Sequence, residues 1–176
     1  MKNPVYVDYH DNEWCVPNFD DGYLYEMLIL ESFQAGLSWE CVLNKREDFR
    51  RAYDDFDINK VILYGEDKVE ELCNNKKIIR NRLKILASIK NSKIFLEIVN
   101  EFGSFYNYLK GFTESKTYYE TNLTKSELSD RISLDLQKRG MRFVGSVIIY
   151  SYLQAVGIIY SHDKECYLGR KAETQP

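Results

Sequence analysis

The chain has 176 residues, of which 44% are hydrophobic, 29% are charged and 14% are aromatic. This length is enough for one compact domain with a core, or for two small lobes that share one. No apolar run is long enough to span a bilayer, and the segment Met1-Lys2-Asn3-Pro4 lacks a signal-peptide pattern, so we expect a cytoplasmic protein with no membrane partner.

The net charge of −3 argues against indiscriminate binding of nucleic acid, because phosphate contacts supply most non-specific affinity. Any DNA-binding surface must therefore be a local basic patch. Two clusters are candidates, and ordinary solvated helix faces are the alternative for both. The first contains Lys76, Lys77, Arg80, Arg82 and Lys84, and the second contains Lys138, Arg139 and Arg142.

Helical spacing dominates the chain, and no convincing alternating strand is present. After a loop-like start, the expected helices cover residues 23–35, 38–53, 57–63, 66–73, 77–102, 104–109, 129–139 and 144–156. Residues 111–125 lose periodicity and indicate a loop, and residues 168–176 indicate a flexible C-terminal tail. Because there are no internal repeats and no Pro- or Ser-rich linker, we predict one all-α domain over residues 1–167.

Glu31 is the most unusual residue of the first predicted helix. Its spacing from Leu24, Met27 and Leu28 places its carboxylate on the face expected to be buried. A buried carboxylate costs several kcal/mol unless something pairs with it. With Trp39 eight residues later, it suits a flat, cationic ligand that donates hydrogen bonds. The alternative is a glutamate neutralised by an arginine or a tyrosine hydroxyl.

A tight turn joins the last two predicted helices, with Gly140 and Gly145 at its ends. Free backbone N–H groups at Gly145 and Ser146, together with the positive end of the following helix, can hold one phosphate. Basic side chains around the turn would add attraction. An ordinary connection between two helices is the alternative.

Several short motifs occur in a fixed order between residues 4 and 166. They are Tyr6, Tyr9-His10-Asp11-Asn12-Glu13-Trp14, Leu30-Glu31, Gln34-Ala35-Gly36-Leu37-Ser38-Trp39, Ile78-Ile79-Arg80-Asn81-Arg82, Lys138-Arg139-Gly140-Met141-Arg142-Phe143-Val144-Gly145, Tyr150-Ser151-Tyr152-Leu153-Gln154-Ala155 and His162-Asp163-Lys164-Glu165-Cys166. This ordered set resembles the bacterial 3-methyladenine DNA glycosylase I family. The resemblance implies a two-lobed helical fold of the helix-hairpin-helix superfamily, with the hairpin at about residues 130–157 and double-stranded DNA in the cleft. Lys138, Arg139, Arg142, Gly145 and Ser146 are then the DNA-binding candidates of the hairpin.

The resemblance also implies a pocket for a base flipped out of DNA, and Glu31, Tyr6, Tyr9, Trp14 and Trp39 are its predicted lining. 3-Methyladenine within DNA carries a positive ring charge that adenine lacks. The face of an indole attracts such a cation by about 0.5–2 kcal/mol, and Glu31 can accept a hydrogen bond from the exocyclic amine.

The break after the first predicted helix is a further DNA-binding candidate. Leu37, at the tip of the break made by Gly36, is the candidate wedge that fills the vacated base stack. Its alternative role is core packing.

Glu31 is the candidate catalytic-site residue, but we assign it chiefly to recognition. Positive charge leaves the base as the glycosidic bond breaks, so a carboxylate bound to the base also stabilises the starting state, and uniform stabilisation does not accelerate chemistry. Many superfamily relatives carry an aspartate after the hairpin, which the resembled family generally lacks. Asp163 is a candidate substitute. No lysine nucleophile is indicated, which favours a monofunctional hydrolase.

The resembled family binds structural zinc with two histidines and two cysteines. The matching residues are His10, His162 and Cys166, and the fourth ligand, a cysteine upstream of the opening motif, has no counterpart before His10 in this chain. Structural zinc sites normally have four ligands, so either water, Asp11 or Cys15 would complete a weakened site, or the true start of the protein lies upstream. The alternative is two ordinary histidines and a buried thiol.

The main hypothesis is a monomeric base-excision repair enzyme that hydrolyses the N-glycosidic bond of 3-methyladenine in alkylated DNA. Its products would be free 3-methyladenine and an abasic site. One rival is a related glycosylase for another base. The other rival is a helix-hairpin-helix DNA-binding module without catalysis, which would need no pocket.

Overall fold

A computed structural model describes residues 3–169, and α-helices make up most of it. The elements in order are α1 (Pro4–Asn12), α2 (Asp21–Gln34), α3 (Trp39–Leu43), α4 (Arg46–Ala52), the 3-10 turn η1 (Asp54–Phe56), α5 (Ile58–Val61), α6 (Glu66–Asn74), α7 (Arg82–Phe102), α8 (Phe105–Thr113), β1 (Tyr118–Tyr119), α9 (Glu127–Lys138), α10 (Ser146–Ala155) and β2 (Ile159–Tyr160). The predicted helical fold class is confirmed. The expectation of no strand was wrong, because β1 and β2 form a short parallel pair.

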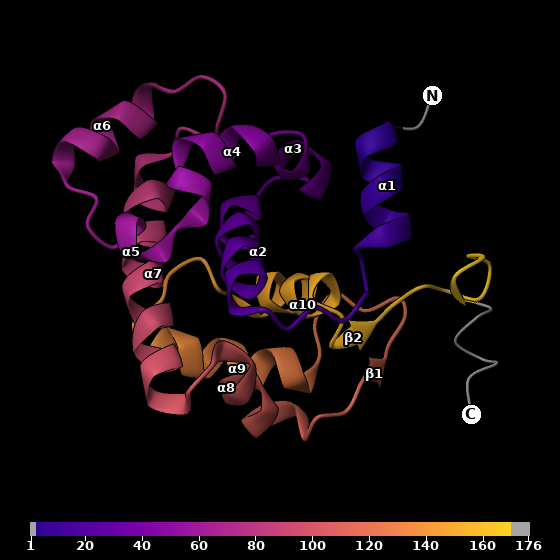
Figure 1. Ribbon diagram of the computed structural model, residues 1–176. Helices are drawn as coiled ribbons and strands as arrows, with labels where there is room; N and C mark the ends of the chain where they lie inside the picture. The colour runs from indigo at the N-terminus through magenta and orange to yellow at the C-terminus, as the bar shows by residue number, and fades with distance from the viewer. Residues whose placement is uncertain (1–2, 170–176) are drawn as a thin grey trace.

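Helix α7 connects two groups of helices. In Figure 1, α4, α5 and α6 gather around one end of α7, and α8 and α9 lie at the other end, with α2 and α10 between them. This arrangement agrees with the predicted two-lobed shape. None of the helices within residues 3–169 has both the length and the apolar character needed to cross a membrane.

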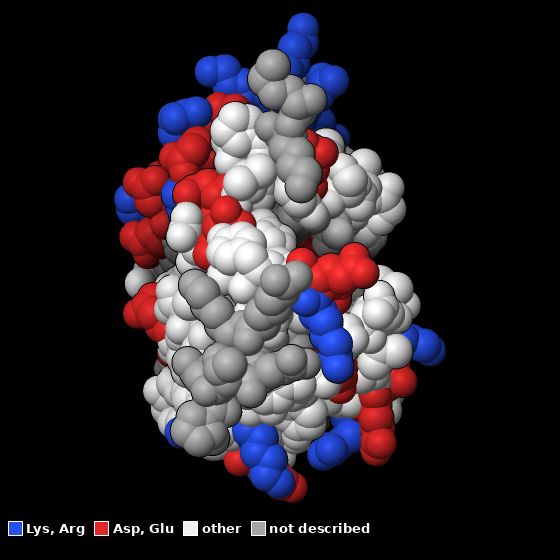
Figure 2. Space-filling model, turned by 90° about the vertical axis from the view of Figure 1, so that its right-hand side faces the viewer, with Lys and Arg blue, Asp and Glu red and all other residues white. Residues whose placement is uncertain are grey.

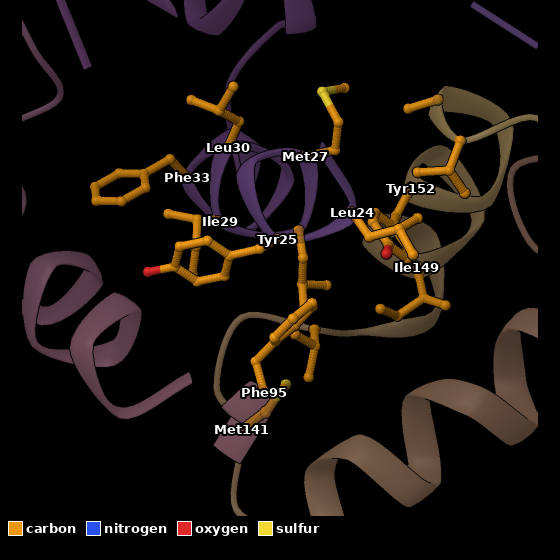
Figure 3. Close-up of a cluster of buried hydrophobic side chains, with 14 of the residues drawn as sticks. Leu24, Tyr25, Met27, Ile29, Leu30, Phe33, Phe95, Met141, Ile149 and Tyr152 are labelled. Atoms are coloured by element: carbon orange, nitrogen blue, oxygen red, sulfur yellow. The ribbon is translucent and has the colours of Figure 1, made fainter. Parts of the chain in front are cut away.

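Helix α2 lies in the middle of the core and is buried on nearly all sides. Figure 3 shows its side chains pointing outward in every direction, with Phe95 of α7 and Ile149 and Tyr152 of α10 close to them. A helix surrounded in this way is apolar all round rather than on one stripe. Any polar residue in its second half, such as Glu31, is therefore in the interior.

Helix α1 was missed by the sequence analysis, which expected a loop there. Asn3 caps it by accepting a hydrogen bond from the backbone N–H of Val5 at 3.1 Å, and Pro4 occupies its first turn. Five of its residues, from Pro4 to Asp8, are exposed, so the helix lacks the apolar stripe that reveals helices in a sequence.

Local capping explains most of the shifted helix boundaries. The predicted helix 77–102 begins only at Arg82, because the Asn81 side chain accepts the backbone N–H of Lys84 at 3.2 Å. The predicted helix 129–139 begins earlier, after a capping box formed by Ser126 and Ser129.

Two other predicted helices also have different bounds in the structure. The predicted helix 38–53 is divided into α3 and α4 by a turn at residues 44–45, and α8 extends to Thr113 instead of ending at 109. Of the predicted tail 168–176, residues 170–176 lie outside the described part of the chain, so its flexibility stays a prediction.

Candidate active site

A cavity of about 400 Å³ opens between α1, the C-terminal half of α2, the start of α3, α10 and the segment after β2. This volume is within the range of small-ligand pockets. All five residues predicted to line a base pocket take part in it. Its lining consists of Tyr6, Tyr9, His10, Trp14, Glu31, Gln34, Trp39, Ser151, Gln154, Ser161, His162, Asp163 and Cys166.

The Glu31 carboxylate is buried without compensation. The residue is only 2% exposed, and its Oε2 atom has no hydrogen-bond partner among residues 3–169. Burial raises the pKa of Glu31 well above its ordinary value. The buried Arg46 pairs instead with Glu13 at 2.7 Å and with Glu26 at 2.6 Å. The alternative of a carboxylate neutralised by an arginine is therefore wrong in this structure.

Aromatic rings form the walls around this carboxylate. The ring centroids of Tyr9 and Trp39 are 5.4 Å apart. Burial, and beside it the charge of Glu31, raises the pKa of Tyr9, which lines the same cavity. The Nε1 atom of Trp39 is buried without a partner in the described residues, and Tyr6 is 43% exposed at the edge of the cavity. The cavity thus combines a negative group with aromatic faces.

Trp14 connects the cavity to the three candidate metal ligands. Its ring centroid lies 4.7 Å from that of His162 and 5.6 Å from that of His10. Cys166 Sγ lies 3.8 Å from His10 Nε2 and 3.5 Å from His162 Nδ1. The three ligand atoms all lie within 4.8 Å of one another. The structure therefore gathers the three residues that the sequence singled out.

The loop after α2 presents Leu37 on the surface. Gly36 has φ = +78°, a left-handed conformation that glycine adopts without strain. Leu37 beside it is 41% exposed. The alternative that Leu37 packs in the core was wrong.

The predicted hairpin forms between α9 and α10. Gly140 has φ = +101°, and the buried Asn91 holds the turn by bonding the backbone N–H and C=O of Arg142 at 2.9 and 2.8 Å. Gly145 is the N-cap residue of α10 and supplies no side-chain cap, so the first N–H groups of this helix, including that of Ser146, have no intrahelical partner.

The basic residues around the hairpin differ in their exposure and in their pairing with acidic side chains. Lys138 and Arg142 are exposed. Arg139 is held by Glu101 at 2.6 Å and Asp135 at 2.9 Å, so its charge is largely compensated within the protein. In the other predicted basic cluster, Arg82 pairs with Glu66, and Lys84 is buried rather than part of a surface patch.

Comparisons with known proteins agree with the kind of ligand that the cavity suits. The methyladenine glycosylase family model matches residues 1–169. The chain belongs to this family. It is 42% identical to DNA-3-methyladenine glycosylase 1 of Escherichia coli strain K12 over 97% of this chain and 95% of that protein. It is 35% identical to the DNA-3-methyladenine glycosylase of Haemophilus influenzae, over 94% and 92% of the two chains.

Solved structures of 3-methyladenine DNA glycosylase I have the same fold. One superimposes with a TM-score of 0.91 at 38% identity, covering 95% of each chain. The enzyme from Staphylococcus aureus gives 0.90 at 32% identity, covering 95% of this chain and 92% of the other. A variant solved in complex with 3-methyladenine gives 0.90 at 31% identity, covering 95% and 93%. The predicted family and the predicted enzyme class, a 3-methyladenine DNA glycosylase, are confirmed.

The sequence analysis missed several polar residues of this methyladenine glycosylase cavity. Gln34 follows Glu31 by three positions on the same helix face, and its buried Oε1 has no partner in the described residues. Ser151 and Gln154 have the same spacing on α10. This spacing of three is the signal that would have found them once Glu31 was placed.

The surface that carries α1 has mixed charge. Figure 2 shows acidic side chains along one edge of this face and lysines or arginines mainly at its ends, with no continuous basic area over its described part. In this methyladenine glycosylase the exposed cations near the hairpin, Lys138 and Arg142, are therefore the better candidates for contact with phosphates.

Proposed function

We propose that the cavity receives 3-methyladenine flipped out of double-stranded DNA, and that the chain hydrolyses its N-glycosidic bond to leave an abasic site. The unpaired, buried carboxylate of Glu31 facing an aromatic cavity is the observation that supports this proposal most strongly. A cationic purine would supply both the missing charge and the missing hydrogen-bond donor. Neutral adenine supplies less of both and keeps its native base pair.

Selection of the lesion then precedes bond cleavage. Flipping costs a few kcal/mol of stacking and pairing, and less for a damaged base. Glu31 accepts a hydrogen bond from the exocyclic amine, and Trp39 offers its ring face to the cationic purine. Tyr6, Tyr9 and Trp14 complete the aromatic lining.

Hydrolysis requires little further help from the protein. The electron pair of the glycosidic bond returns to the positively charged base, which leaves as neutral 3-methyladenine. Water adds to the sugar carbon and releases one proton to the solvent. Asp163 also lines the cavity and is a candidate for orienting that water. The lining residues include no lysine, which supports a monofunctional hydrolase rather than a strand-cleaving lyase.

The hairpin and the loop after α2 are the proposed DNA contacts. The N–H groups of Gly145 and Ser146 would hold one phosphate at the N-terminus of α10, with Lys138 and Arg142 adding charge. Leu37, made accessible by Gly36, would fill the space left by the flipped base. One chain contains both the cavity and these contacts, so a monomer suffices.

His10, His162 and Cys166 fit a structural zinc ion. A tetrahedral zinc with bonds of about 2.0–2.3 Å separates its ligand atoms by about 3.3–3.8 Å. Cys166 Sγ lies 3.8 and 3.5 Å from the two facing histidine nitrogens, and all three ligand atoms lie within 4.8 Å of one another, so the two histidines would move slightly closer around a bound ion. Each other ring nitrogen has an oxygen partner. His10 Nδ1 lies 2.8 Å from Asp11, and His162 Nε2 lies 3.3 Å from the Trp14 carbonyl. Such outer partners orient metal ligands.

Neither Asp11 nor Cys15 is in position to be the fourth ligand. Asp11 faces the histidine nitrogen that points away from Cys166. Cys15 Sγ accepts the backbone N–H of Ser161 at 3.3 Å, and it is not among the ligand atoms that gather with those of His10, His162 and Cys166. Zinc would join α1 to the C-terminal segment and thereby fix Tyr6, Tyr9 and Trp14.

Protein purified without chelators is expected to contain about one zinc per chain by elemental analysis, and Cys166→Ser should lose most of it. Removing the metal should lower the melting temperature, because the ion links the two ends of the chain. Cys41→Ser, a thiol away from the cluster, is the matched control. Wild-type protein free of zinc would contradict the assignment.

The activity is tested by incubating alkylated duplex DNA with the protein and separating the released bases by chromatography. We expect free 3-methyladenine and abasic sites, and no covalent DNA adduct after borohydride reduction. Release of a different base alone would favour the rival glycosylase. Binding to duplex without release of any base would favour a DNA-binding module, and a trapped adduct would refute the monofunctional reaction.

A further inference from the structure

Lys84, near the start of α7, is a buried lysine with unusual partners. It is 7% exposed, and its Nζ donates hydrogen bonds to the carbonyl oxygens of Phe33 at 2.8 Å and Ala35 at 2.5 Å. Nζ also lies 5.8 Å from the ring centroid of Phe143. No carboxylate pairs with it among residues 3–169, and burial lowers the pKa of its ammonium group. Main-chain oxygens and one aromatic ring therefore hold this cation.

The two carbonyl groups belong to the C-terminal end of α2. The last carbonyls of a helix have no intrahelical partner and carry partial negative charge. Ala35, the C-cap residue, has ψ = 114°, and the backbone N–H of Leu37 bonds the Gln34 carbonyl at 2.6 Å. Lys84 supplies donors to two further carbonyls of this end, those of Phe33 and Ala35. It thereby fixes the chain immediately before Gly36, Leu37 and Trp39.

The aromatic partner belongs to the hairpin. Phe143 has φ = +55°, a conformation that is costly for a bulky residue and persists only when its surroundings hold it. The neighbouring Arg142 is bound through both of its backbone groups by Asn91, about two turns further along α7 than Lys84. Residues 82–91 of α7 thus support both the loop after α2 and the hairpin between α9 and α10.

We propose that Lys84 is a positioning residue that holds the loop of residues 35–39 in a set position relative to the hairpin of residues 140–145. The loop carries the candidate wedge Leu37 and the base-binding Trp39, and the hairpin carries the candidate phosphate site. Because Lys84 contacts both segments, it sets the distance between the candidate phosphate site and the cavity for the flipped base. This inference rests on the proposed function of the two segments.

The test compares Lys84→Met with wild type in single- and multiple-turnover release of 3-methyladenine. Methionine keeps most of the side-chain volume but removes the donor and the charge. A misplacement of about 1 Å in a reacting complex costs up to about 100-fold in rate. We expect kcat to fall about 10- to 100-fold, whereas KM and the affinity for undamaged duplex change by less than about threefold, because the hairpin keeps its hold through Asn91.

Ser92→Ala is the control for stability alone. Ser92 is fully buried on the same helix, and its hydroxyl bonds the Tyr25 hydroxyl at 2.6 Å and the Ser88 carbonyl at 2.7 Å rather than either DNA-contacting segment. It should destabilise the protein without changing kcat. Fluorescence of 2-aminopurine placed opposite the lesion should report wedge insertion, and Lys84→Met should reduce this signal while Ser92→Ala retains it.

Lys84→Gln, which keeps an N–H donor without the charge, should lie between wild type and Lys84→Met, and it replaces the methionine variant should that protein not fold. An unchanged kcat in the lysine variants, or an equal loss of kcat in Ser92→Ala, would overturn the positioning role while leaving the proposed function intact. A wild-type protein that releases no 3-methyladenine would instead refute the proposed function.

Discussion

Glu31→Gln is expected to release 3-methyladenine from alkylated DNA about 10- to 100-fold more slowly than wild type, because a hydrogen bond to a charged group contributes about 1.5–3 kcal/mol. Glutamine preserves the shape of the side chain but removes the negative charge. The uncompensated carboxylate is what distinguishes a cationic purine from neutral adenine in this cavity. The loss should therefore appear mainly in kcat/KM, while affinity for undamaged duplex is retained.

The same variant should be more stable than wild type at neutral pH when no ligand is bound. Burial raises the pKa of Glu31 in the folded protein above the value of about 4.5 for the unfolded chain. The folded state therefore holds this proton more tightly, and wild-type stability falls as pH rises from about 4.5 through the raised pKa. Glutamine does not titrate, so the stability gain of Glu31→Gln should be present at pH 8 and disappear toward pH 4.5.

Chemical denaturation of both proteins at pH 5 and pH 8 measures this difference. Glu70→Gln is the matched control, because Glu70 is an exposed residue on α6 and does not line the cavity. A Glu31→Gln protein that releases 3-methyladenine as fast as wild type would remove Glu31 from recognition. A stability gain that is the same at both pH values would show that ionisation of Glu31 is not its cause.

Trp39→Ala should weaken binding to lesion-containing DNA about 10- to 100-fold, because stacking of a base on an aromatic side chain contributes about 1–3 kcal/mol. Trp39 packs against Tyr9 with a centroid distance of 5.4 Å and lines the cavity. Its removal takes away both the stacking surface and the electron-rich face offered to the cationic purine. Competition binding with duplexes that carry a lesion, or none, measures the loss.

Trp39→Phe tests whether Trp39 acts by stacking on the base or only by filling the cavity. Phenylalanine keeps an aromatic face, so we expect it to retain most of the affinity, whereas Trp39→Leu should behave like Trp39→Ala. Equal affinities for Trp39→Ala and wild type, or equal losses in Trp39→Phe and Trp39→Leu, would mean that the indole face does not contact the base.

The helical fold was predictable because its signals are local. The apolar run of α2 is buried on nearly all sides, and this burial is what the spacing around Glu31 indicated. Helix α1 escaped notice because its exposed residues carry no apolar period. The β1–β2 pair joins Tyr118 to Ile159, and two-residue strands so far apart in the sequence leave no periodic pattern to detect.

The sequence singled out several of the residues that line the cavity, but it did not indicate the contacts between distant parts of the chain. His10 and Cys166 are gathered although 156 positions separate them, and the ordered motifs rather than their spacing pointed to the pair. Lys84 and Arg139 were both assigned to basic clusters from charge alone. Whether a cation faces solvent depends on partners elsewhere in the chain, such as the Phe33 carbonyl for Lys84 and Glu101 for Arg139.

A crystal structure of the protein soaked with 3-methyladenine tests most directly where the base is recognised. We expect the purine ring in the cavity, its face against Trp39 and its exocyclic amine within hydrogen-bond distance of a Glu31 carboxylate oxygen. A base bound elsewhere, or a cavity closed by protein side chains with Glu31 paired to one of them, would contradict recognition by this carboxylate and this indole.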